Sequence, residues 1–226
     1  MTTIKERPIL FSAPMVRAIL EGRKTVTRRE VKKSAALDCL AAGFEPAFLA
    51  LPGNADLCPY GKPGDRLWVR ETWGVISHDF DELGNMVDWV PDRPASPIRE
   101  MRFGQGYYSG HVIFRADGEA EWAGDDDGGG DDRSAWKPSI HMPRIASRLL
   151  LEITAVRVER LQDISEEQAI AEGLLREDDM WRGASGLPSF PSPIAAFAHL
   201  WISINGVEGW NANPWVWVVE FKRVTP

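Results

Sequence analysis

A tight turn runs directly into a strand in the first third of the chain. Residues 62–65 read Lys-Pro-Gly-Asp, and proline followed by glycine favours a turn. The next segment, 66–75, is rich in β-branched and aromatic side chains, which predicts a strand. Alternation along that strand places Trp68 and Arg70 on one face and Glu71 on the other. The fold must therefore contain a sheet that this segment can join.

Strand signals outnumber helix signals along the rest of the chain. Further strands are expected at 8–11, 107–116, 149–160 and 215–221. Helices are expected at 12–22, 164–173 and 192–206. Ser165 and Gln168 have the spacing of a capping box at the start of the second of these helices. The balance predicts an α+β fold, a small mixed β-barrel with flanking short helices.

The composition is that of an ordinary folded protein. Hydrophobic residues make up 44% and charged residues 26% of the 226 residues, which is enough to bury a sizeable core. Cys39 and Cys58 lack the spacing of a metal site, and the acidic run at 125–132 does not match a calcium loop. We therefore expect no metal or organic cofactor and interpret the acidic run as a solvated loop.

The net charge of −7 is unevenly distributed along the chain. Residues 1–33 hold nine Lys or Arg against three Asp or Glu, whereas the remainder holds 17 against 30. Non-specific coating of nucleic acid relies on many phosphate contacts, so the overall charge argues against it. A local basic surface on an acidic protein suits a nucleotide or another small anionic ligand better than a long duplex.

The sequence contains no signal for a membrane or for export. No run approaches the roughly eighteen apolar residues that span a bilayer. The first residues, Met-Thr-Thr-Ile-Lys-Glu-Arg, lack the apolar stretch of a signal peptide. A cytoplasmic location without a membrane partner is expected, and no feature indicates an oligomeric state.

A basic, Thr-rich segment follows the first predicted helix. Gly22 ends that helix, and the residues after it are Arg-Lys-Thr-Val-Thr-Arg-Arg. Their β-like alternation puts Thr27 and Arg29 on one side and Lys24 and Arg28 on the other. The segment therefore brings basic and hydroxyl side chains to one short strand.

Three motifs, in this order, resemble the ASCH family of the PUA-like superfamily, which is found in bacterial and phage-type proteins. They are Gly-Arg-Lys-Thr-Val-Thr at 22–27, Gly-Asp-Arg-Leu-Trp-Val-Arg at 64–70 and Trp-Val-Val-Glu-Phe at 217–221. The resemblance extends over 137–173. It implies a single domain, 1–226, with insertions at about 34–61, 77–135 and 174–192.

The resemblance also implies an activity. Some ASCH proteins are small amidohydrolases that remove the acetyl group from N4-acetylcytidine with a Lys, a Thr and a Glu. The matching residues here are Lys24 as the base, Thr27 as the nucleophile and Glu172 as the proton donor to the leaving amine. This division is chemically sensible, because a hydroxyl needs an adjacent base and amide cleavage needs a protonated leaving nitrogen. An unprotonated lysine would require burial or a nearby positive charge, such as that of Arg28 or Arg29.

Further residues are candidates for contacts with the substrate. They are Arg28, Arg29, Glu71, Trp73, His141 and Arg144. Each also has a structural interpretation: Glu71 fits an ion pair with an arginine, and His141 fits an ordinary polar loop residue. Lys24 and Thr27 would equally suit a solvated helix end and a plain strand position. Trp217 stands where the family has a smaller aromatic residue, which predicts a remodelled pocket.

Three functions remain open, and each has a nucleoside or RNA as its ligand. The first is an amidohydrolase acting on an N4-acylated cytidine or a related acylated nucleoside through Lys24, Thr27 and Glu172. The second is a noncatalytic RNA or modified-base binding module, which needs an open basic groove and tolerates loss of Thr27. The third is a ribonuclease that depends on Lys24 and His141 with little dependence on Thr27.

Overall fold

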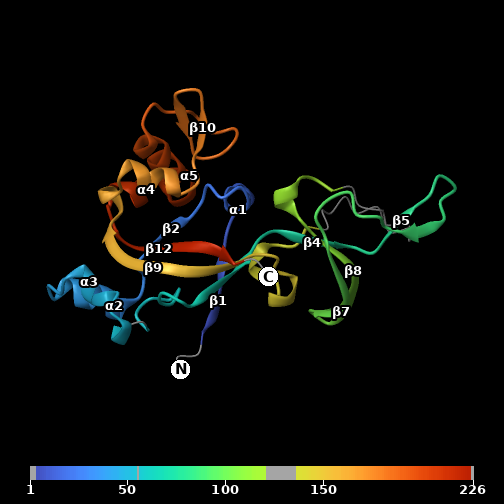
Figure 1. Ribbon diagram of the computed structural model, residues 1–226, viewed down its shortest axis with the longest axis horizontal. Helices are drawn as coiled ribbons and strands as arrows, with labels where there is room; N and C mark the ends of the chain where they lie inside the picture. The colour runs from blue at the N-terminus through green and yellow to red at the C-terminus, as the bar shows by residue number, and fades with distance from the viewer. Residues whose placement is uncertain (1–3, 55, 121–135, 225–226) are drawn as a thin grey trace. The chain divides into compact units, whose positions relative to one another are not determined.

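The protein has a mixed α and β architecture. The computed structural model describes residues 4–54, 56–120 and 136–224 (Figure 1). The chain divides into two compact units. The first unit comprises Met1–Ile9, Ala18–Trp68 and Leu149–Pro226, and the second comprises Leu10–Arg17 and Val69–Arg148. The α+β class is confirmed, while the single domain with insertions stays a prediction.

A five-stranded sheet forms the body of the first unit. Its strands run in the order β1 (Glu6–Leu10), β3 (Arg66–Arg70), β9 (Leu150–Arg160), β12 (Trp215–Val224) and β2 (Val26–Glu30). The long strand β12 pairs antiparallel with β9 on one side and with β2 on the other. The N-terminal basic segment is thereby tied to the C-terminal strand.

The predicted barrel is not visible in this sheet. Hydrogen bonding among the described residues leaves β1 and β2 as its two edges. The described strands therefore form an open sheet rather than a closed barrel, and the PUA-like barrel stays a prediction.

Short helices and a small hairpin accompany the sheet. The helices are α1 (Ala13–Leu20), α2 (Ser34–Ala41), α3 (Pro46–Leu49), α4 (Glu166–Ala171) and α5 (Pro193–Asn211), and β10 (Leu175–Glu177) pairs with β11 (Met180–Arg182). Turns of 3-10 helix occur at Pro52–Asn54, Arg115–Asp117, Ser139–His141, Arg144–Ala146 and Leu161–Asp163. No helix in the described ranges is long and apolar enough to cross a membrane.

Helices α4 and α5 cover one face of the sheet, above β9 and β12 in the view of Figure 1. Val26, Val216 and Val218 of the sheet pack there with Phe197 and Trp201 of α5. Alternation along β2 and β12 brings these three valines to the same face. Arg28 shares that face with Val26, so a charged side chain extends into an apolar core.

The capping box at the start of α4 is confirmed. Ser165 Oγ accepts a hydrogen bond from the backbone N–H of Gln168 at 3.3 Å, and Gln168 Oε1 accepts one from the backbone N–H of Ser165 at 3.2 Å. The predicted end of α5 is marked by a kink rather than a stop, because Gly206 takes φ 79° inside the helical segment. The helix then continues to Asn211.

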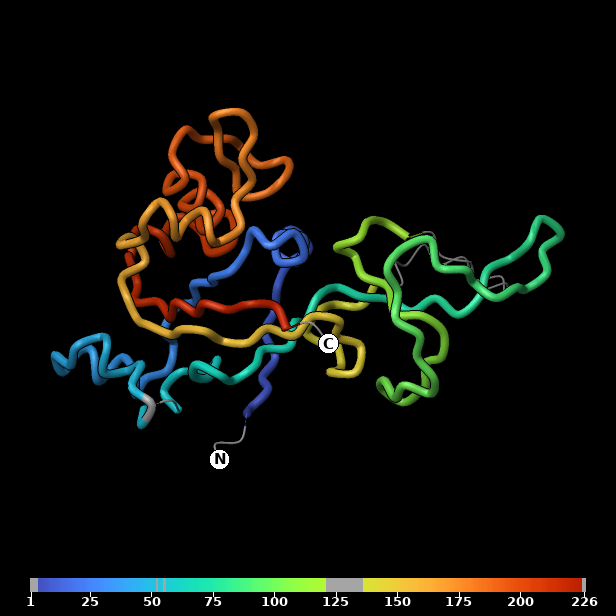
Figure 2. The backbone as a smooth tube through the Cα atoms, viewed as in Figure 1, coloured from blue at the N-terminus to red at the C-terminus, as the bar shows by residue number. Residues whose placement is uncertain are grey.

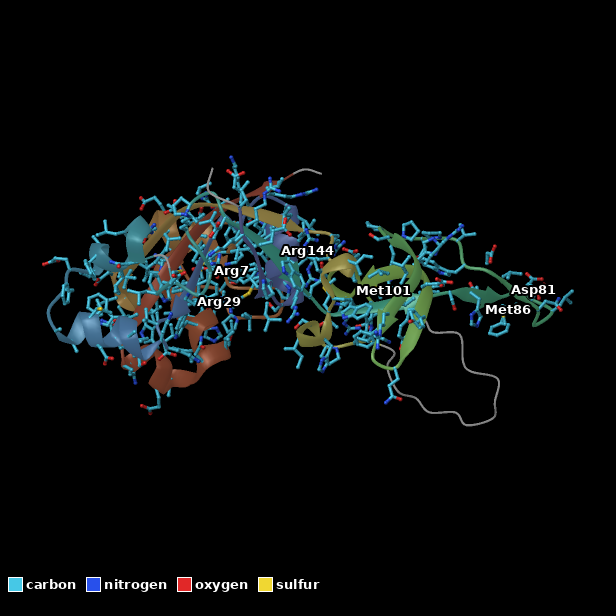
Figure 3. The ribbon with its side chains drawn as sticks, turned by 90° about the horizontal axis from the view of Figure 1, so that it is seen from below. Arg7, Arg29, Asp81, Met86, Met101 and Arg144 are labelled. Atoms are coloured by element: carbon cyan, nitrogen blue, oxygen red, sulfur yellow. The ribbon has the colours of Figure 1, made fainter. Side chains whose placement is uncertain are left out.

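The second unit has a sheet and a core of its own. Its strands lie in the order β4 (Trp73–Ile76), β8 (Gly106–Phe114) and β7 (Ser96–Phe103), and a separate hairpin pairs β5 (His78–Phe80) with β6 (Met86–Asp88). Asp81 and Met86 mark the β5–β6 hairpin in Figure 3. The core contains Trp73, Met101, Val112, Phe114 and Met142. The segment 77–110, within one of the expected insertions, thus contains a hairpin.

The single strand predicted at 66–75 is divided into β3 and β4. Glu71 lies in the break, where its backbone N–H donates to Met142 Sδ at 3.4 Å and its carboxylate binds Arg148. These contacts take Glu71 out of the strand ladder, which explains the interruption. The acidic run at 125–132 lies outside the described residues.

Candidate functional site

The segment leading into β2 is joined to the end of α4 by main-chain contacts. Lys24 and Glu172 form an isolated antiparallel bridge, and the N–H of Thr25 donates to the carbonyl of Ala171 at 2.9 Å. The same approach of the two segments is visible in the backbone trace of Figure 2. Two parts of the chain about 150 residues apart are therefore held in register by the backbone.

Glycine at position 173 allows this close approach. Gly173 has φ +98°, and a Cβ added there would lie 2.8 Å from the Cβ atoms of both Ala18 and Lys24. Only glycine combines this backbone conformation with the absence of a side chain. The glycine that ends the predicted helix therefore also makes room for Lys24.

The side chains of Lys24 and Glu172 form a buried ion pair. Lys24 Nζ donates to Glu172 Oε2 at 2.6 Å and to the backbone carbonyl of Glu172 at 2.9 Å. The two side chains are only 1% and 5% exposed. Burial lowers the pKa of Lys24, and the opposing attraction of Glu172 does not fully offset that effect. The pair is suited to proton transfer, because desolvation disfavours the charged lysine.

Arg28 lies beneath this pair and has no exposed side-chain surface. Its Nη2 donates to Glu159 Oε1 and to Gln168 Oε1, both at 2.6 Å, and its Nη1 lies 3.5 Å from Glu172 Oε1. The guanidinium also stands over the ring of Phe197, 5.9 Å from its centroid. Arg28, expected to contact substrate, is thus held by protein groups inside the first unit.

Thr27 occupies the other face of β2. It pairs with Val219 of β12, and alternation places it opposite Val26 and Arg28. The residue is 2% exposed. The structure therefore places the three predicted catalytic residues in one unit, with Lys24 and Glu172 in contact and Thr27 on the adjoining strand.

Arg29 shares the Thr27 face of the sheet and pairs with Trp217. Burial raises the pKa of Tyr60, and the charge of Arg29 opposes that shift, which places Arg29 close to the phenol. Trp217 is fully buried, and its Nε1 has no hydrogen-bond partner among the described residues. The face around Thr27 is thus lined by an arginine and two aromatic side chains.

Four of the predicted contact residues belong to the second unit. Glu71 is 1% exposed and ion-paired with Arg148, which is the structural interpretation of that residue. Trp73 is fully buried in the second core, edge-on to Phe103. His141 and Arg144 lie exposed on consecutive 3-10 turns. The structure brings none of these four into the unit that holds Lys24, Thr27 and Glu172.

The residues that support the ion pair are not evident from the sequence. The capping-box spacing identifies Gln168 but gives no sign of its contact with Arg28. Glu159 lies 131 positions from Arg28 along the chain, so no local pattern links them. The one signal in the sequence is the alternation that puts Arg28 on the same face of β2 as the apolar Val26.

No protein-family model, curated protein or solved structure matches the chain. A functional conclusion must therefore rest on the chemistry of the residues themselves.

Proposed function

We propose that the protein is an amidohydrolase that removes the acyl group from an N4-acylated cytidine or a related acylated nucleoside. Within this proposal the chain is an ASCH-type protein, and Lys24, Thr27 and Glu172 carry out the reaction. The observation that supports it is the buried Lys24–Glu172 pair at the start of the strand that carries Thr27.

The pair can supply both a base and an acid. The hydrogen bond of 2.6 Å between Lys24 Nζ and Glu172 Oε2 lets one proton reside on either group. Burial lowers the pKa of Lys24 and so favours its free amine. The proposed reaction starts from the form of the pair in which the shared proton is on Glu172. In that form Lys24 accepts a proton while Glu172 donates one, and the total charge of the pair does not change.

The reaction then proceeds through an acyl-enzyme. Lys24 takes the proton of the Thr27 hydroxyl as the oxygen attacks the acyl carbon. The bond from that carbon to the nucleoside nitrogen breaks, and Glu172 protonates the nitrogen. Water attacks the resulting ester, giving its proton to Glu172, and Lys24 returns a proton to the Thr27 oxygen. The products are a carboxylic acid and the nucleoside with a free amino group.

The proposal requires Thr27 Oγ1 to come within hydrogen-bond reach of Lys24 Nζ when substrate is bound. Catalytic hydrogen bonds are often long in the absence of substrate and shorten in the complex. The two residues lie three positions apart, with Lys24 bridged to α4 and Thr27 paired to β12. A bound acyl group would need to reach the Thr27 face of β2.

The test is an assay of cytidine release from N4-acetylcytidine and other N4-acylated cytidines. Lys24→Ala and Thr27→Ala are compared with matched controls, Lys32→Ala and Thr25→Ala, which change exposed residues in the same segment. We expect both site variants to lose at least about a hundredfold in rate and both controls to keep wild-type rates. Absence of release by the folded wild-type protein would refute the proposal.

A noncatalytic reader of RNA or of a modified base is the second candidate. The exposed side chains of His141 and Arg144 in the second unit favour it, because base and phosphate contacts need accessible donors. This candidate predicts RNA binding that is weakened by Arg144→Ala and unaffected by Thr27→Ala. A filter-binding assay at two salt concentrations separates it from the amidohydrolase.

A further inference from the structure

Arg28 holds both ends of helix α4, which is only six residues long. Gln168, the third residue of the helix, accepts from Arg28 Nη2 at 2.6 Å, and Glu172, the residue that caps its C-terminal end, lies 3.5 Å from Arg28 Nη1. A helix this short has little stability of its own and depends on contacts outside it. A single side chain on β2 therefore links the start of α4 to its end.

The carboxylate of Glu172 is divided between two cations. Its Oε2 lies 2.6 Å from Lys24 Nζ and its Oε1 lies 3.5 Å from Arg28 Nη1. Main-chain contacts already fix the backbone of Glu172, so the guanidinium acts on the direction of the side chain. With one oxygen facing Arg28, the other is directed at the lysine.

The charge of Arg28 is balanced without Glu172. Glu159 binds Arg28 Nη2 at 2.6 Å through Oε1, and its other oxygen accepts from Arg157 Nε at 3.0 Å. Arg157 in turn pairs with Glu220 on β12. Glu159 therefore neutralises the charge of Arg28. The contact of 3.5 Å between Arg28 and Glu172 is the longer one, so it orients the Glu172 carboxylate while Lys24 remains the main partner of Glu172.

We propose that Arg28 is a positioning residue, which orients the Glu172 carboxylate toward Lys24 Nζ by anchoring both ends of α4. Arg28 itself is held by Glu159 and Gln168, so its guanidinium is engaged by protein groups rather than by a substrate. The orientation of Glu172 is a property of the free protein and does not depend on the proposed amidohydrolase function. Only the effect of Arg28 on catalysis rests on that proposed function.

The experiment compares Arg28→Gln with the matched control Arg157→Gln, which removes an arginine from the same Glu159 carboxylate. The titration of Lys24 is followed by NMR of lysine labelled at Cε, with Lys24→Arg identifying its signal. Glu172 raises the pKa of Lys24, whereas the nearby charge of Arg28 lowers it to a lesser extent. Loss of positioning therefore lowers the pKa of Lys24 in Arg28→Gln, and Arg157→Gln leaves it unchanged.

The direction of this change decides between positioning and simple charge repulsion. A rise in the pKa of Lys24 would show that Arg28 is merely a neighbouring charge, and an unchanged titration would show no influence at all. Either result overturns the proposal, whether or not the wild-type protein hydrolyses acylated cytidines. An absent wild-type activity thus refutes the proposed function without deciding the role of Arg28.

Where hydrolysis is observed, kinetics provide a second readout. We expect Arg28→Gln to lower kcat about a hundredfold with little change in KM, since misplacing a catalytic group affects the chemical step. Arg28→Lys restores the charge without the forked geometry and should recover little of the loss. If Arg28→Gln does not fold, Gln168→Ala serves instead, because it releases the start of α4 and keeps the arginine; an unaltered Lys24 titration there would contradict the proposal.

Discussion

Arg148 donates two parallel hydrogen bonds to the buried carboxylate of Glu71, from Nε to Oε1 at 2.9 Å and from Nη2 to Oε2 at 3.0 Å. The same guanidinium binds Asp117 at 2.7 and 3.0 Å, and it stands 4.0 Å from the centroid of the Phe114 ring. Forked contacts of this kind are the strongest that arginine makes. The arrangement joins the two ends of the Val69–Arg148 segment of the second unit around one cation.

Arg148→Met should therefore destabilise the second unit. The substitution leaves two carboxylates near each other without a cation, and Glu71 is only 1% exposed. We expect the free energy of unfolding to fall by about 3 kcal/mol, as measured by urea titration at neutral pH. Arg99→Met, which changes an exposed arginine of β7, is the matched control. A loss no greater than in this control would mean that the pair contributes nothing to stability.

Asp65 gives the first unit a stability that depends on pH. Burial alone would raise the pKa of this carboxyl, but hydrogen bonds from the Lys5 N–H, the Arg7 guanidinium and the Lys62 N–H outweigh burial and lower it. A carboxyl whose pKa is lower in the folded state stabilises the protein above its unfolded pKa. That contribution is lost as the pH falls through the folded value.

Asp65→Asn tests this sign directly. At pH 7 we expect the variant to be about 2 kcal/mol less stable than the wild-type protein, because charged hydrogen bonds are lost. The difference should shrink as the pH falls below the ordinary aspartate range. Urea titrations from pH 7 to the acid limit of folding measure it, with Asp38→Asn on the exposed side of α2 as the control. A difference that is constant over this range would contradict the assignment.

The capping box of α4 provides a further prediction. Ser165→Ala removes the acceptor for the Gln168 N–H, and caps of this type contribute about 1 kcal/mol. Ser34→Ala, at the exposed start of α2, removes no such bond and should change little. Thermal unfolding followed by circular dichroism compares the two. Equal melting temperatures for both variants would show that the cap does not contribute to the stability of the protein.

Local chemistry explains what the sequence can and cannot predict. The capping residues and Gly173 are enough to place Glu172 at a helix end, and alternation along β2 is enough to separate Thr27 from Arg28. Lys24 and Glu172 lie 148 positions apart in the sequence, and no local pattern predicts that the fold brings them into contact. Only the family resemblance pairs these two residues at the level of the sequence.

Burial is the quantity that the sequence predicts least well. Alternation gives two faces of a strand but does not say which face a second layer will cover. Trp73, expected at a ligand, is therefore found fully buried in the second core. The interruption of the strand at Glu71 follows from Arg148 and Met142, which lie far along the chain. Such pairings are tertiary and override local strand propensity.

Gly173→Ala is expected to disturb the Lys24–Glu172 pair through simple crowding. The methyl group would meet the Cβ atoms of Ala18 and Lys24 at 2.8 Å, a separation that forces one of them to move. The matched control is Gly43→Ala, since Gly43 also has a positive φ, +84°, but no atom lies within 4 Å of the point that a Cβ would occupy there. Both variants have a strained backbone at the substituted residue, and only Gly173→Ala also has a steric clash.

Comparing Gly173→Ala with Gly43→Ala separates the effect of the steric clash from the effect of the positive φ. We expect Gly43→Ala to lower the free energy of unfolding by about 1 kcal/mol through its left-handed backbone. Gly173→Ala should lose about 2 kcal/mol more, the usual effect of overpacking. Urea titration measures both losses, and the NMR titration of Lys24 should shift in the Gly173 variant alone. Similar losses in the two variants, with an unmoved lysine signal, would mean that α4 shifts freely and that the bridge between Lys24 and Glu172 does not define the site.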